Sequence, residues 1–311
     1  MPDIVVMFFL LGLLSGLMKS DLAIPKAAYD VLSLLLMLTI GLKGGMALHG
    51  NMGLHLFYEL LAVAALGFII PLCLFPLLRG VVRLNLADSA SFIAHYGSVS
   101  AGTFAVALAY AETHQLMVSG QVTLYLVMLE VPAIIIGIFL YRHFSKVHTE
   151  TKTNGMSILH ESLTNRGVVL LVGGVIIGWM YGPYQGSGVT DLYTGAFMGV
   201  LALFLLEMGI VAADSLRVVS WDKARIIVFA LLAPLVLSLL GIAVGKMLNM
   251  PDGSVLVLAV LTASASYIAA PVAIRAAIPQ ADIGLAMLAS LGVTFPFNVL
   301  IGIPLYHNLM L

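Results

Sequence analysis

Long apolar runs separated by short polar segments dominate the chain. A run of about 20 apolar residues is long enough to cross the hydrocarbon core of a bilayer as a helix. Ten such runs occur, near residues 3–18, 29–48, 54–79, 86–111, 118–142, 167–182, 191–213, 224–247, 253–278 and 283–308. The pattern therefore predicts an all-α polytopic membrane protein with ten transmembrane helices.

One longer polar segment divides these runs into two sets of five. Residues 143–166 are rich in Lys, His, Thr, Glu and Asn, whereas the segments between the other runs are short. We therefore predict three parts, with a first five-helix repeat at 1–142, a cytoplasmic linker at 143–166 and a second five-helix repeat at 167–311.

The two halves resemble each other internally. Residues 36–45 match residues 204–213, and further on Ser98-Val99-Ser100 matches Ser264-Ala265-Ser266. The fifth and tenth runs also share a proline among apolar residues and end in a tyrosine. A repeat with an odd number of spans must insert its second copy upside down, so the sequence predicts an inverted repeat.

Two of the runs, the fourth and the ninth, are interrupted at matching places. Small hydroxyl residues, Gly or Pro break them at residues 97–103 and 263–271. Broken helices at membrane depth are tolerated where they face protein or a water-filled cavity, and a matched pair indicates the binding site of a transporter. The alternative is that Ser, Gly and Ala only allow the helices to pack closely.

A helix that restarts inside the membrane presents free N–H groups and the positive end of its dipole, which suits an anion. The hydroxyls at the two breaks can add hydrogen bonds to such an anion or contacts to a small cation. We therefore predict that the substrate-binding residues include Ser98, Ser100, Thr103, Ser264 and Ser266. Thr103 and Ser264 are also candidates for cation coupling.

Three charged residues lie inside predicted spans, where an unpaired charge costs roughly 2.5–3.5 kcal/mol. The repeat alignment places Lys43 one helical turn from the position equivalent to Glu207, so we predict an intramembrane ion pair between them. Glu130 is a candidate for cation or proton coupling, or it caps a break beside Pro132. His95 either relays protons or is a packed polar residue.

The composition supports a membrane protein and limits the chemistry. The chain has 311 residues, of which 61% are hydrophobic and 9% charged, and a mean hydropathy of +1.09. A soluble domain carries about 25% charged residues. The net charge of -1 argues against a nucleic-acid partner, and the single cysteine, Cys73, against a disulfide framework.

The sequence shows no Gly-rich phosphate loop, no zinc-binding spacing and no nucleophile elbow. We therefore predict no catalytic residue, no cofactor and no resident metal ion. Transport would run on an ion gradient or downhill, and His95 beside Ser98 gives only slight support to an intramembrane hydrolase.

The basic residues predict the orientation in the membrane. If the N-terminus lies outside, the odd-numbered loops are cytoplasmic and hold twelve of the fourteen Lys and Arg residues, all except Lys43 and Lys246. By the positive-inside rule, both termini then face away from the cytoplasm. Residues 1–4 lead at once into the first run, so we interpret it as a membrane helix and not as a removable signal peptide.

At the residues just described, the sequence resembles the sodium-dependent bicarbonate transporters first recognised in cyanobacteria, whose relatives occur in many bacteria. The resemblance covers nearly the whole chain. It is most specific at residues 40–47, at Ser98, Ser100 and Thr103, and at residues 263–266, 271–279 and 302–305.

This resemblance implies ten spans in two inverted repeats, a division into core and gate domains, and a homotrimer in the bacterial inner (plasma) membrane. It also implies bicarbonate held between the broken fourth and ninth helices, with sodium co-transported. The Ser-rich motif of the family falls on Ser98, Ser100, Gly102, Thr103, Ser264 and Ser266. The cyanobacterial members are inhibited by a small trimeric protein similar to PII, so a PII-like partner is expected on the cytoplasmic face.

The second break departs from those members, which have further Ser and an Asp there. Here Tyr267, Ala269 and Ala270 are expected to remove possible ligands. The first hypothesis is a sodium-coupled importer of bicarbonate across the lipid bilayer. The alternatives are a proton- or sodium-coupled transporter of another small anion, and a non-transporting membrane protein that senses anions or serves as a scaffold.

Overall fold

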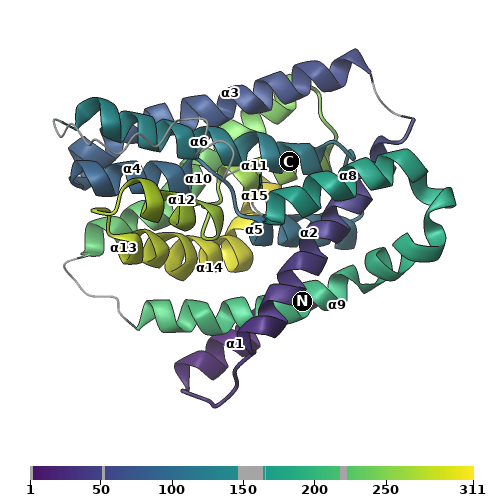
Figure 1. Ribbon diagram of the computed structural model, residues 1–311, viewed down its shortest axis with the longest axis horizontal. Helices are drawn as coiled ribbons and strands as arrows, with labels where there is room; N and C mark the ends of the chain where they lie inside the picture. The colour runs from purple at the N-terminus through teal and green to yellow at the C-terminus, as the bar shows by residue number, and fades with distance from the viewer. Residues whose placement is uncertain (1–2, 51–52, 146–163, 165, 218–222) are drawn as a thin grey trace.

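The structure is a computed structural model that describes residues 3–50, 53–145, 164, 166–217 and 223–311. Helices account for all regular structure in these residues, and no strand occurs among them (Figure 1). The helices before the linker are α1 (Ile4–Leu17), α2 (Lys26–Leu48), α3 (Leu54–Leu77), η1 (Leu78–Val82), α4 (Leu86–Tyr96), α5 (Ala101–Thr113) and α6 (Val122–Phe144). Those after it are α8 (Arg166–Gln185), α9 (Ser187–Leu216), α10 (Ala224–Met247), α11 (Asp252–Thr262), α12 (Ala269–Ala277), α13 (Ile283–Met287), η3 (Leu288–Thr294), α14 (Phe295–Phe297), η4 (Asn298–Gly302) and α15 (Ile303–Met310).

The ten predicted apolar runs all fall on helical segments. Eight helical stretches in the described residues are long and apolar enough to cross a membrane, and two shorter apolar helices, α1 and α11, complete the set. The fourth run is α4 followed by α5, and the ninth is α11 followed by α12. The protein is therefore a polytopic helical membrane protein, as the sequence predicts. The linker predicted at 143–166 lies mostly outside the described residues.

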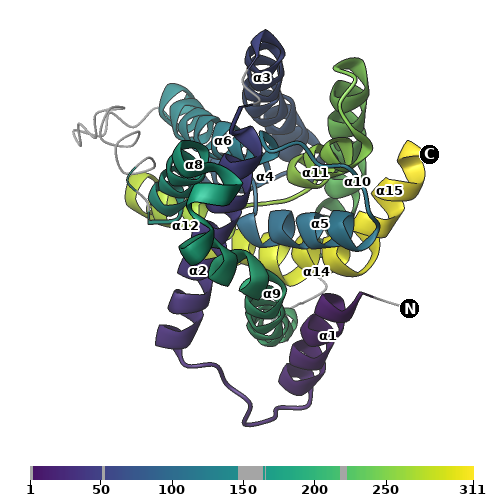
Figure 2. The same ribbon diagram turned by 90° about the vertical axis from the view of Figure 1, so that its right-hand side faces the viewer.

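The helices form two groups that lie side by side (Figures 1 and 2). In the first group α1 packs along α9, and α2 packs along both α8 and α9. In the second group α6 packs on α3 and α4, while α10 packs on α11 and η3. The shared boundary of the two groups includes contacts of α5 with α2 and α9. We call α1, α2, α8 and α9 the first group, and α3–α6 with α10–α15 the second.

Glycines set the close approach of α2 to α8. Gly41 and Gly45 on α2 face Gly174 and Gly178 on α8, and each pair is four residues apart. A Cβ built on Gly174 would lie 2.8 Å from the carbonyl oxygen of Leu38 and 3.0 Å from the Cα of Gly41. Small residues at this spacing let two membrane helices pack backbone against backbone.

Substitution of Gly174 is therefore expected to separate the two helices. We predict that Gly174→Leu lowers the thermal midpoint of the detergent-solubilised protein, because the overpacked interface costs about 1–3 kcal/mol or more. The matched control is Gly173→Leu, since a Cβ at Gly173 meets no atom within 4 Å. Equal midpoints for the two variants would contradict the glycine-mediated packing.

Candidate functional site

Both predicted breaks are present in the structure. The helix α4 ends at Tyr96 and α5 begins at Ala101, so residues 97–100 leave the helix. In the second half α11 ends at Thr262 and α12 begins at Ala269, which leaves residues 263–268 non-helical. Both segments are almost entirely buried, so their free backbone groups must find partners within the protein.

The two breaks provide hydrogen-bond partners for each other's free backbone groups. The backbone N–H of Ser100 in the first break donates to the hydroxyl of Ser264 in the second, over 2.9 Å. In return, the backbone N–H of Ser266 donates to the carbonyl of His95 at the end of α4, over 2.8 Å. Segments more than 160 residues apart in the sequence are thus fixed against each other at one point inside the second group.

Serine hydroxyls start the helices that follow the breaks. The Oγ of Ser100 accepts from the N–H of Thr103 over 3.1 Å, which makes Ser100 the N-cap of α5. The Oγ of Ser266 accepts from the N–H of Ala270 in the first turn of α12, over 3.2 Å. In both bonds the hydroxyl oxygen is the acceptor, so the Ser266 hydrogen is still available to an anion. The Ser100 hydroxyl also interacts with the hydroxyl of Tyr267.

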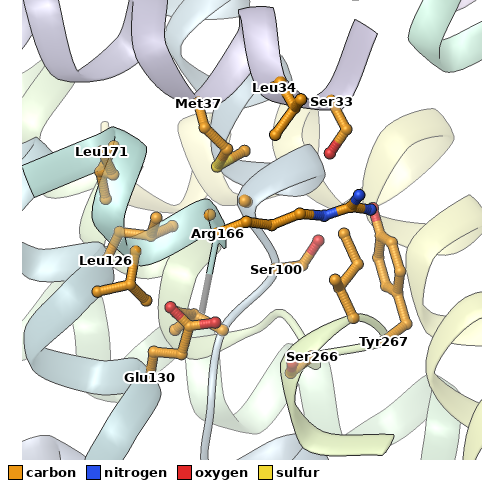
Figure 3. Close-up of a pocket in the computed structure, with 15 residues that line it drawn as sticks. Ser33, Leu34, Met37, Ser100, Leu126, Glu130, Arg166, Leu171, Ser266 and Tyr267 are labelled. Atoms are coloured by element: carbon orange, nitrogen blue, oxygen red, sulfur yellow. The ribbon is translucent and has the colours of Figure 1, made fainter. Parts of the chain in front are cut away.

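A cavity lies against both breaks and is lined by residues from α2, α6 and α8 as well (Figure 3). Ser100, Ser266 and Tyr267 border it from the breaks, and Glu130 and Arg166 border it from α6 and α8. Its volume is about 40 Å³. Roughly 10–15 Å³ is enough for one water molecule, so the cavity suits a very small polyatomic ion better than a large organic acid.

Arg166 brings positive charge to this cavity. It is the first residue of α8, and its side chain extends across the cavity above Ser100 (Figure 3). One guanidinium nitrogen of Arg166 lies 2.5 Å from a carboxylate oxygen of Asp30 on α2. The Arg166 side chain is 54% exposed, so the cavity has an arginine on its solvent side, held by an acidic partner.

Tyr267 places a hydroxyl at the same cavity, contrary to the expectation that this residue removes a ligand. Its ring packs edge-on against Phe295 at a centroid distance of 5.4 Å. Its Oη is buried and interacts with the hydroxyl of Ser100. With Ser100 as the donor, the Tyr267 hydroxyl keeps its own hydrogen, which it can donate to an ion or water in the cavity.

The other predicted binding residues do not line the cavity. Ser264 is part of the framework, because its hydroxyl donates to the carbonyl of Leu261 over 2.8 Å and accepts from Ser100. Ser98 is buried, and its hydroxyl has no partner among the described residues. Thr103 is buried in the first turn of α5. Gly102 leaves room for the Tyr267 hydroxyl and the Phe204 ring, since a Cβ would overlap the Oη of Tyr267 and lie 2.9 Å from the ring of Phe204 on α9.

The two titratable candidates of the sequence occupy different places. Glu130 lines the cavity, on α6 two residues before Pro132. His95 is fully buried at the end of α4, where its Nδ1 lies 2.7 Å from the carbonyl oxygen of Ser91. Its Nε2 has no partner among the described residues, and His95 does not border the cavity. Glu130 is therefore the titratable candidate that can contact a bound ion.

The predicted ion pair between Lys43 and Glu207 is replaced by another. Lys43 forms its salt bridge with Glu112 near the end of α5, and its ammonium lies 4.4 Å from the ring centroid of Phe197. The Glu207 carboxylate instead accepts a hydrogen bond from the backbone of Ile24, just before α2. About 26 Å of helix separates the start of α2 from Lys43, so the two residues lie at different depths.

Three residues of the site were not singled out as binding residues from sequence, namely Arg166, Asp30 and Tyr267. Arg166 belongs to the polar linker by composition, and Asp30 lies near the start of the run predicted at 29–48. Only the packing of α2 against α8 brings these two together beside the breaks. Arg166 could have been found from the sequence, because it is the last basic residue before the apolar run at 167–182.

These features define a class of protein, a polytopic membrane protein with a small charged cavity where two broken helices cross. The comparison with known families agrees with this class. The sequence profile of the Na+-dependent bicarbonate transporter superfamily matches residues 4–311. The chain belongs to that family, which is a family of transporters. No curated protein matches the chain.

Proposed function

We propose that the protein imports bicarbonate together with sodium by alternating access. The observation that carries the proposal is the cavity at the crossing of the two breaks, which is bordered by Arg166 on one side and Glu130 on the other. An anion and a cation can be held there together, and opposite charges placed side by side lower the cost of removing each from water. Binding of one ion then favours binding of the other.

The anion half of the proposed site combines hydroxyls with one arginine. Ser266 and Tyr267 each have a hydroxyl hydrogen that can donate to an oxyanion, Ser100 interacts with the Tyr267 hydroxyl, and Arg166 can add charge-assisted hydrogen bonds. The first turns of α5 and α12 point N–H groups and the positive ends of their dipoles towards the breaks. This donor set suits a small oxygen-rich anion such as bicarbonate.

The sodium half is proposed to use oxygen atoms, which a hard cation prefers. Glu130 supplies a carboxylate at the cavity. The breaks at 97–100 and 263–268 free backbone carbonyls from the helical ladder at the same place. Thr103 and Ser264 remain proposed contributors from behind the cavity wall. Sodium is the transported cargo in this proposal, because the family is sodium-dependent.

The packing of the helices supports a proposed inverted repeat of ten spans. In such a repeat α1 corresponds to α8, and α2 corresponds to α9. In the first group α2 packs along α8, and α9 packs along α1. The repeat symmetry converts each of these two helix pairs into the other. The first group then corresponds to the gate domain and the second to the core domain, with the site where the groups meet. The proposed division of the chain remains 1–142, 143–166 and 167–311.

The proposed setting is the bacterial inner membrane, with both termini outside the cytoplasm and twelve of fourteen basic residues inside. In this orientation Arg166 lies on the cytoplasmic side, so the cavity opens towards the cytoplasm. The family resemblance supports a homotrimer. A PII-like regulator is proposed to contact the cytoplasmic face, where the linker at 143–166 is predicted.

Radiolabelled bicarbonate uptake into proteoliposomes tests the function. An inward sodium gradient is expected to drive accumulation, and a proton gradient without sodium is not. Uptake that follows the pH gradient alone would favour proton coupling, and uptake of another small anion would change the substrate. Bicarbonate binding without flux in sealed vesicles would favour a sensor.

Neutralising Glu130 tests the sodium half of the site. We predict that Glu130→Gln raises the sodium concentration for half-maximal uptake about tenfold or more, equivalent to about 1.4 kcal/mol of lost attraction. Bicarbonate binding in saturating sodium should change much less. The control is Glu112→Gln, which removes a carboxylate paired with Lys43 away from the cavity. An unchanged sodium dependence in Glu130→Gln would exclude a role for this carboxylate.

A further inference from the structure

An apolar groove on the outer surface of the second group lies between α3 and α10, and it shares no lining residue with the cavity of the proposed transport site. It is lined by Leu74, Leu77, Val81, Val82, Ala224, Arg225, Val228, Phe229, Leu232, Ala233, Val236 and Leu237. Its volume is about 560 Å³. Pockets for small-molecule ligands span roughly 300–1,000 Å³, so the groove is large enough to hold a ligand.

The groove has exposed walls and a buried floor. Val81, Val228 and Val236 on its walls are all more than half exposed, as expected for side chains that face lipid. Phe229 forms part of the floor, and its ring contacts Tyr96 at the end of α4 at a centroid distance of 4.8 Å. The floor is thus rigid aromatic packing, and what fills the groove must come from the membrane side.

The length of the groove matches one leaflet. Along α10 it extends over the fourteen residues from Ala224 to Leu237, or roughly 20 Å of helix. A bilayer with its headgroup regions is about 40–45 Å thick, so one leaflet is about 20 Å thick. The groove is therefore long enough for a single acyl chain together with its headgroup.

Positive charge is gathered at the surface end of the groove. Arg225 lines the groove, is exposed, and has no hydrogen bond or ion pair with another described residue. Arg79 and Arg83 are exposed in and just after η1, which contacts α10 at this end. Arg79 donates to the carbonyl of Leu84 over 2.6 Å. None of the residues that line the groove is acidic.

We propose that this groove binds an anionic phospholipid, with one acyl chain along α10 and the phosphate at Arg225. Basic pockets between membrane helices on the cytoplasmic side recognise anionic headgroups in this way. A two-fold contact with a second copy of the chain fits less well, because it would bring the same arginines together, and a contact within a trimer is distinguished by the oligomeric state measured below. The inference does not depend on the transported substrate.

Photo-cross-linking of the full-length protein in liposomes tests the proposal. The probes are phosphatidylglycerol and phosphatidylcholine that carry the same photoactivatable acyl chain. We expect phosphatidylglycerol to label residues 74–82 and 228–237 more strongly than phosphatidylcholine does. Arg225→Gln should lower the phosphatidylglycerol labelling about fivefold, the attraction that one basic residue supplies near a membrane surface. It should leave the phosphatidylcholine labelling unchanged.

Two further variants complete the test. Leu232→Trp fills the groove and should reduce labelling by both lipids. Lys19→Gln removes an exposed cation after α1 and should change neither. Equal labelling by the two lipids in the unmodified protein, or labelling that Arg225→Gln leaves intact, would overturn the proposal. So would a change in oligomeric state of Leu232→Trp, because it would identify a second copy as the occupant.

Discussion

Sodium-driven bicarbonate uptake is expected to fall about a hundredfold or more when Ser100 and Ser266 are both replaced by alanine. A hydrogen bond to a charged group contributes about 1.5–3 kcal/mol, so the loss of two corresponds to roughly 10²–10⁴ in affinity. Both hydroxyls border the cavity; Ser266 retains a hydrogen for the anion, and Ser100 interacts with the Tyr267 hydroxyl that donates beside it. The measurement is the initial rate of uptake of radiolabelled bicarbonate into proteoliposomes.

The control for this pair is the double variant Ser238→Ala and Ser290→Ala. Both serines are fully buried, and their hydroxyls donate only to carbonyls of their own helical segments, those of Leu235 and Ala286. Alanine at Ser100 also removes a helix N-cap, which costs about 1 kcal/mol of stability. Thermal midpoints of both double variants therefore accompany the transport rates. Normal uptake by a folded Ser100/Ser266 variant would remove these residues from the site.

The second large effect concerns Arg166 and Asp30. We predict that Arg166→Gln raises the bicarbonate KM about tenfold to a hundredfold, because a charge-assisted hydrogen bond to the anion is lost. Asp30→Asn is expected to lower the KM, because the carboxylate that competes with the anion for the guanidinium is removed. The opposite directions distinguish anion binding from a purely structural salt bridge, whose loss would affect both variants alike.

A second arginine–aspartate pair provides the matched control. Arg217 and Asp214 at the end of α9 form a salt bridge of 3.0 Å away from the cavity. Arg217→Gln and Asp214→Asn should leave the bicarbonate KM within about twofold of the unmodified protein, since an exposed pair contributes only a few tenths of a kcal/mol. If Arg166→Gln and Asp30→Asn shift the KM in the same direction, Arg166 is not an anion ligand.

The helices and their two breaks could be predicted from the sequence because the signals are local. A run of apolar residues determines a membrane helix by its length, and Ser, Gly and Pro in the middle of two runs mark the interruptions at 97–100 and 263–268. The contact between the two breaks, where Ser100 donates to Ser264, joins the same matched positions. These features need no knowledge of how distant helices pack.

The cavity itself depends on packing between distant segments. Arg166 reaches the breaks because α8 lies along α2, and the Tyr267 hydroxyl lies beside Ser100 of the other break, with its ring packed on Phe295. The pair predicted between Lys43 and Glu207 was wrong for a related reason. Equivalent residues of an inverted repeat lie at equal distances on opposite sides of the membrane midplane. An alignment therefore identifies which residues correspond but does not place them at the same depth in the membrane.

The most direct test of the account is an experimental structure determined in sodium bicarbonate, compared with one in a buffer that lacks both ions. We expect density for a small planar anion within hydrogen-bond distance of Ser100, Ser266 and Tyr267, and density for a cation beside Glu130. Anion density elsewhere, with the cavity at the crossing of the two breaks unchanged between the two structures, would contradict the account.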